Sequence, residues 1–117
     1  MGYSVSPEKI PVARFRKVPV YPLELFRAGT TGEAKIEFTV DTEGNVRDVS
    51  ILYATKQEFG LTSAKTMLSW KFRPGAQEGK PVSVRMVQVF VFTGKEVQIA
   101  STTLADSGQK EPEPNKK

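Results

Sequence analysis

The sequence predicts an α+β fold, a two-layer sandwich in which an antiparallel sheet of three to four strands, in the order 2-1-3, carries two helices on one face. Residues 34–40 alternate between apolar and polar side chains, as a half-buried strand does. The segment Asp41-Thr42-Glu43-Gly44 then favours a tight turn into a second alternating run. A helical pattern separates this hairpin from a third, strongly apolar strand, which completes the prediction.

Length and composition limit what the chain can be. Its 117 residues have polar, Pro-containing ends, which leaves room for one domain over residues 19–103. Residues 1–18 are predicted to be an extended lead-in, and residues 104–117 a disordered polar tail, because they have too few apolar side chains to form a core.

The chain contains no His and no Cys. The usual zinc ligands and the common pairs of nucleophile and base are therefore missing. We expect no enzyme activity, no cofactor and no metal. No apolar run approaches the roughly 18 residues of a membrane span, so no direct membrane contact by this domain is expected.

The first predicted element is a short helix over residues 23–28, which begins after Pro22 and stops at Gly29. In the return strand of the hairpin, Val46 is out of phase with the later apolar residues, which indicates a bulge near Arg47 and Asp48.

A second helix should follow the hairpin. Thr55 and Glu58 have the spacing of a capping box, in which both side chains bind free amides at the helix start. Apolar residues then recur at helical spacing, and Pro74 is expected to end the helix. Residues 75–81 are expected to be a loop.

The last strand of the predicted core, Ser83 to Phe92, is apolar on both faces. Such a pattern is typical of a covered central strand or of a strand whose second face awaits a partner. The helix carries the chain back along the sheet, so this strand should pair beside the first one. That topology predicts an edge strand with free main-chain groups.

A further alternating run, with Val97, Ile99 and Ser101, follows a turn at Thr93-Gly94. We expect residues 95–102 either to cap the edge as a fourth strand or to exchange between two chains in a homodimer.

Four motifs together indicate a family. They are Val20-Tyr21-Pro22, Gly32-Glu33-Ala34, the turn Val40-Asp41-Thr42-Glu43-Gly44-Asn45-Val46 and the segment Ser69-Trp70-Lys71-Phe72-Arg73-Pro74-Gly75. In order and spacing they resemble the C-terminal domain of the TonB family, from about Pro19 to Ile99. The membrane anchor and long Pro-rich spacer of that family are missing from this sequence, and a polar tail extends beyond the usual end.

The resemblance implies a periplasmic protein-binding domain of an energy transducer. Such a domain binds the TonB-box peptide of outer-membrane receptors by β-strand addition and couples the proton-motive force of the inner membrane to transport. The full-length protein would be anchored in the inner membrane and driven by a complex of the ExbB and ExbD type, reached through the missing N-terminal anchor. The alternative is a TonB-like scaffolding or self-association module without a transport receptor.

The candidate partner-peptide site combines the predicted edge strand with the segment before Tyr21-Pro22, which contacts the receptor peptide in the family. Its residues are Arg16, Lys17, Val18, Pro19, Val20, Ser83, Val84, Arg85, Met86, Val87, Gln88, Val89, Phe90, Val91 and Phe92.

Other interpretations are weaker. Asp41 and Glu43 lie on a solvated turn, where nothing would raise a carboxyl pKa for acid-base catalysis. Gly79-Lys80 lacks the spacing of a phosphate loop. The net charge of +4 is a mild bias, and the aromatic residues are expected to be buried, so no nucleic-acid partner is predicted. Trp70 and Phe72 are expected to be structural.

Overall fold

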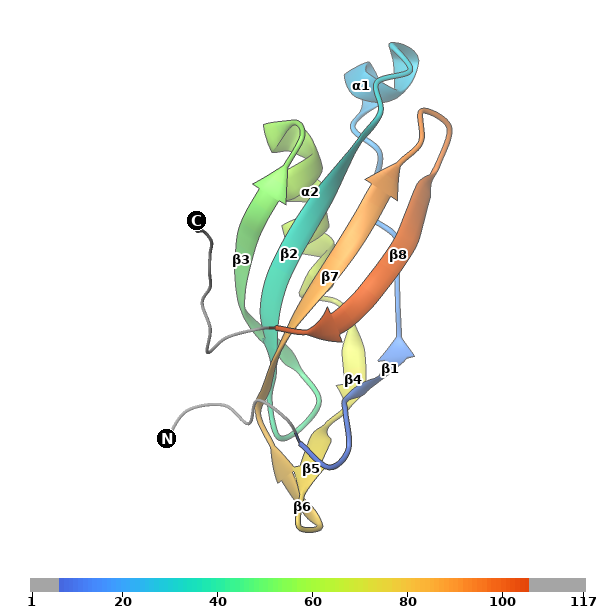
Figure 1. Ribbon diagram of the computed structural model, residues 1–117. Coiled ribbons are helices and arrows are strands. Elements are labelled where there is room, and N and C mark those ends of the chain that lie inside the picture. The colour runs from blue at the N-terminus through green and yellow to red at the C-terminus, as the bar shows by residue number, and fades with distance from the viewer. Residues whose placement is uncertain (1–6, 106–117) are drawn as a thin grey trace, which may run out of the picture.

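The computed structural model describes residues 7–105 and confirms the α+β class (Figure 1). Within that range, the main sheet has four antiparallel strands in the order β3-β2-β7-β8. They are β2 (Gly32–Val40), β3 (Val46–Ala54), β7 (Val84–Phe92) and β8 (Val97–Leu104). The helices are α1 (Leu23–Arg27) and α2 (Gln57–Met67).

Two small ribbons complete the structure. In the first, β1 (Val12–Phe15) pairs with β4 (Lys71–Arg73), so part of the predicted lead-in is a strand of the fold. In the second, β5 (Gly75–Gln77) pairs with β6 (Lys80–Val82), where a loop was predicted. Both were missed because three-residue and four-residue strands are too short to establish a periodic pattern.

The β2–β3 hairpin has the predicted turn. The Asp41 carboxylate accepts hydrogen bonds from the main-chain N–H groups of Glu43 and Asn45, both at 2.9 Å. Gly44 has a φ of 87°, the left-handed conformation that glycine adopts at little cost. The predicted bulge is also confirmed, because the pairing shifts beside Asp48, which has a φ of 52°.

The predicted limits of the second helix are wrong at both ends. The Thr55 hydroxyl accepts the main-chain N–H of Glu33 at 3.0 Å, so no capping box forms, and α2 begins at Gln57. The helix ends at Met67, well before Pro74. The chain leaves the helix there because Trp70 and Phe72 are buried in alternation, which extended backbone allows.

The core lies between the main sheet and a layer made of α2 and the β1–β4 ribbon. Its aromatic residues interlock, with the rings of Phe59 and Phe92 stacked at 4.0 Å between centroids. Helix α1 lies beyond the end of the sheet (Figure 1) and has no buried residue. The fully buried large side chains of the core include Trp70, Phe38, Phe59, Phe90, Phe92, Ile36, Met67 and Met86.

The strand order 2-1-3 is confirmed for β3, β2 and β7, but the expectation that β7 lies at an edge is wrong. Gly94, with a φ of 97°, lets the chain reverse, and β8 then pairs with β7 along its length. The capping alternative is therefore the arrangement within this chain. β8 includes Leu104, and Ala105 donates its N–H to the Arg85 carbonyl oxygen at 2.9 Å. The rest of the predicted tail, residues 106–117, and residues 1–6 of the lead-in lie outside the described residues.

No helix in residues 7–105 is long and apolar enough to cross a membrane.

Candidate functional site

The predicted peptide-binding strand is the inner strand β7, flanked by β2 and β8. Its side chains alternate strictly between buried and half-buried positions. The buried ones face the helix layer, and Arg85, Val87, Val89 and Val91 lie on the other face of the sheet. Ser83 precedes the strand. An extended ligand therefore reaches the main chain of β7 only where β8 now lies.

Strand β8 is held differently from the other strands of the sheet. It is the only one of the four without a buried residue, and five of its eight residues are exposed. Val97, Ile99 and Leu104 alone pack against the core, each only partly buried. Main-chain pairing with β7 is thus its principal attachment.

One polar side-chain contact joins the two strands. Thr102 on β8 lies opposite Gln88 on β7, and its hydroxyl donates a hydrogen bond to the Gln88 carboxamide oxygen. The Gln88 Nε2 group donates to the Val89 carbonyl oxygen at 2.8 Å. Gln88 is polar and fully buried, whereas every other core-facing residue of β7 is apolar.

The turn between β7 and β8 is tied to the Tyr21-Pro22 segment. The Gly94 N–H donates to the Tyr21 hydroxyl oxygen at 2.8 Å, and that hydroxyl donates to the Thr30 carbonyl oxygen. The Tyr21 ring packs edge-on against Phe92, with 5.2 Å between ring centroids. Tyr21 therefore links the segment Arg16–Val20, which it directly follows, to the end of β7.

The segment Arg16–Val20 is anchored from its main chain. The Trp70 indole N–H donates to the Lys17 carbonyl oxygen at 2.9 Å, and the Thr62 hydroxyl donates to the Val20 carbonyl oxygen at 2.8 Å. Pro19 is buried, whereas Val18 and Val20 are exposed. The segment thus presents side chains to solvent from a fixed backbone.

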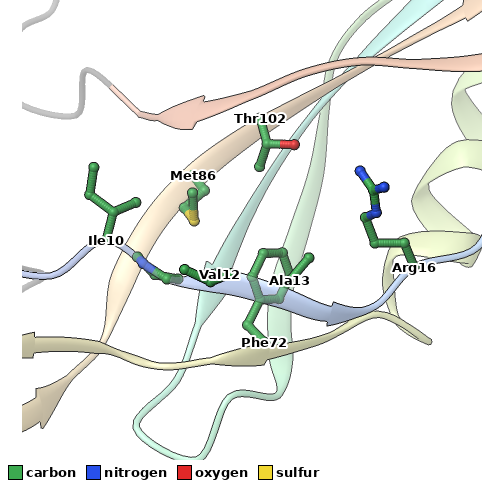
Figure 2. Close-up of a pocket in the computed structure, with 8 residues that line it drawn as sticks. Ile10, Val12, Ala13, Arg16, Phe72, Met86 and Thr102 are labelled. Atoms are coloured by element: carbon green, nitrogen blue, oxygen red, sulfur yellow. The ribbon is translucent and has the colours of Figure 1, made fainter.

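A cleft of about 340 Å³ brings the two predicted segments together. Figure 2 shows it between β1 and the strands β7 and β8, with Met86 and Thr102 on the sheet side. The lining residues are Ile10, Pro11, Val12, Ala13, Arg16, Phe72, Met86 and Thr102. Arg16 and Met86 come from the predicted site, whereas the β1 residues and Thr102 were missed because they belong to an unrecognised strand and to the capping segment.

A second cleft, of about 440 Å³, lies between the segment Arg16–Val20 and α2. Lys17 and Val20 line it from the segment Arg16–Val20, and Thr62, Lys65, Thr66 and Ser69 line it from the helix side. The Thr62 and Ser69 hydroxyls already donate to main-chain carbonyl oxygens. Lys17 and Lys65 are the two cationic residues among those that line this cleft.

The acidic turn is structural. Burial disfavours ionisation of Asp41, but hydrogen bonds from Arg47 and from the amides of Asn45 and Glu43 outweigh that effect and lower its pKa. A general acid near neutral pH needs the opposite shift. Within residues 7–105 there is no group of three or more His, Cys, Asp or Glu residues that could hold a metal ion.

Comparisons with known proteins agree with this architecture. The family model "Gram-negative bacterial TonB protein C-terminal" matches residues 17–93. Protein TonB of Pseudomonas aeruginosa is 29% identical over 75 residues, which cover 63% of this chain and 22% of that protein. Protein TonB of Yersinia enterocolitica is 32% identical over 69 residues, covering 58% of this chain and 27% of that protein. The match thus spans about a quarter of the length of these relatives.

A solved structure supports the same assignment. The solution NMR structure of the Pseudomonas aeruginosa TonB C-terminal domain superposes with a TM-score of 0.61 at 26% identity. The match covers 70% of this chain and 84% of that one. Because the family model, the curated relatives and the solved structure converge on one domain, the chain belongs to the TonB C-terminal domain family of Gram-negative bacteria.

Proposed function

We propose that this chain is the periplasmic protein-binding domain of a TonB-type energy transducer. It binds an extended peptide at the periplasmic end of an outer-membrane receptor by β-strand addition. The whole protein is anchored in the inner membrane and draws on a proton-driven complex of the ExbB and ExbD type. Membership of the TonB family supports this role, which is one of binding and not of catalysis.

The observation that carries the proposal is the weak attachment of β8. A strand with no buried residue loses little apolar contact when it leaves the sheet. A peptide that takes its place forms an equivalent set of main-chain hydrogen bonds, so the exchange costs little on the β7 side. Strand β7, by contrast, is fixed by five buried side chains and by pairing with β2, and it stays in place as the template.

The segment Arg16–Val20 completes the site in this proposal. Arg16 lines the cleft beside Thr102 and Met86, so a peptide along β7 passes directly beside its guanidinium group. Lys17 and Val20 extend the contact surface toward α2. Exposed cations of this kind steer the encounter with an acidic peptide more than they add to affinity.

An NMR titration of the full chain with synthetic peptides from the periplasmic ends of outer-membrane receptors tests the proposal. We expect the largest amide shifts in β7 and β8, together with signals of a released β8. Shifts confined to β3, or none with any receptor peptide, would contradict strand addition at β7.

The same samples address the alternative, a self-association module. A concentration-dependent dimer that ignores receptor peptides would favour that alternative, because exchange of β8 between two copies uses the same β7 surface.

A further inference from the structure

Gln88 breaks the pattern of its strand. It is the single polar residue among the core-facing side chains of β7, and it is fully buried. An apolar side chain would pack there without the cost of burying a carboxamide. We propose that Gln88 is a selectivity determinant, which requires Thr or Ser opposite it in any strand that pairs with β7 from the β8 side. The inference rests on the proposed function, because it concerns the strand that replaces β8.

The hydrogen bonds of Gln88 show what an incoming strand must supply. Its Nε2 group donates to the carbonyl oxygen of Val89, which is part of the same strand and stays when β8 leaves. Its Oε1 atom accepts from the hydroxyl of Thr102, which belongs to β8. Among the described residues, Thr102 is the only one that donates to this oxygen through its side chain. Departure of β8 therefore removes that donor.

An apolar residue opposite Gln88 would leave the carboxamide oxygen buried without a partner. Main-chain pairing alone cannot distinguish one extended peptide from another, because every residue other than proline offers the same groups. The buried Gln88 oxygen can distinguish between peptides. A strand with Thr or Ser opposite Gln88 donates a hydrogen bond to this oxygen, and a strand with Val or Ala does not.

The same pair fixes the register of the incoming strand. A slip of two residues in β8 would set Leu104 or Ala100 against Gln88, and neither has a donor in its side chain. The ligand predicted by this geometry is an extended segment with one hydroxyl-bearing residue. Apolar side chains flank that residue on the same face, as Ile99 and Leu104 flank Thr102 in β8.

The test uses two synthetic peptides with the sequence of residues 95–105, one unchanged and one with Val in place of the threonine at the position of Thr102. Thr and Val have nearly the same shape, so the peptides differ mainly in the hydroxyl group. The first protein is the 117-residue chain with Thr102→Val, whose own β8 no longer satisfies Gln88. The second carries Gln88→Leu in addition. Dissociation constants come from fluorescence anisotropy, and thermal unfolding verifies that both proteins fold.

We expect the Thr peptide to bind the Thr102→Val chain about tenfold more tightly than the Val peptide, because an unpaired buried oxygen weakens binding by that order. In the chain with Gln88→Leu the ratio should fall to about 1. Equal binding of both peptides to the chain that retains Gln88 would overturn the role of Gln88 and leave strand addition intact. If neither peptide binds either chain, strand addition at β7 and the role of Gln88 are both overturned.

Discussion

Gly44 is the residue at which the β2–β3 hairpin meets the second layer. Its N–H donates to the Asp41 carbonyl oxygen at 2.9 Å, and its own carbonyl oxygen accepts the N–H of Phe72 at the same distance. The close approach to β4 leaves no space for a side chain. A Cβ atom built on Gly44 would lie 1.9 Å from the Phe72 carbonyl oxygen.

Gly44→Ala should therefore lower the free energy of unfolding by about 3 kcal/mol, through the positive φ and the main-chain clash together. Gly79→Ala is the matched control, because Gly79 also has a positive φ but open space around it. The control should lose only about 1 kcal/mol. Urea denaturation of both variants measures the difference, and equal losses would show that contact with Phe72 is unimportant.

At the residue scale the sequence predicts backbone conformation better than it predicts contacts between residues far apart in the chain. The Asp41–Gly44 turn and the bulge at Asp48 follow from local chemistry and are confirmed. That Gly44 lies against Phe72 depends on β4, which no local pattern indicates. The sequence shows Gln88 as one polar residue among the apolar core-facing residues of β7. Its partner Thr102 can be identified only from the register of β7 and β8.

At the scale of elements, long strands with a clear alternation were predictable and short ones were not. β2, β3 and β7 appear where periodicity predicted them. Whether β7 lay inside the sheet depended on β8, whose alternating side chains fit both a capping strand and an exchanged one. The end of α2 was misplaced because Trp70 continues the helical spacing of the apolar residues, whereas the burial of both Trp70 and Phe72 requires extended backbone.

The Tyr21 hydroxyl joins the turn before β8 to Thr30, which follows α1. Tyr21→Phe removes the hydroxyl that joins Gly94 to Thr30 and leaves the ring packing in place. We expect a loss of about 1 to 2 kcal/mol in the free energy of unfolding. Relative to the unchanged chain, amide hydrogen exchange should accelerate more in β8 than in β2.

Tyr53→Phe is the control for this prediction. Tyr53 is 49% exposed on the outer strand β3, and the substitution should change neither quantity. If Tyr21→Phe left the exchange of β8 amides as slow as in the unchanged chain, the link between Tyr21 and β8 would be refuted.

At the scale of the whole molecule, the fold separates a rigid template from a removable strand. β2 and β7 are held by the core between the sheet and the α2 layer, whereas β8 adds main-chain pairing and only partly buried side chains. The segment Arg16–Val20 is bound to Trp70 on the helix side, and Tyr21 after it binds the turn that precedes β8. A partner strand can therefore be exchanged at one side of the sheet while the core stays intact.

The most direct test of this account fixes β8 in place. Val87 and Thr103 lie opposite each other on β7 and β8, and antiparallel partners are about 4.5 to 5.5 Å apart between Cα atoms, which suits a disulfide. Because the chain has no cysteine of its own, a protein with Val87→Cys and Thr103→Cys can form only this bridge within one chain. We predict that the oxidised protein fails to bind a receptor peptide and that reduction restores binding. Equal affinity in the oxidised and reduced forms would contradict the central claim.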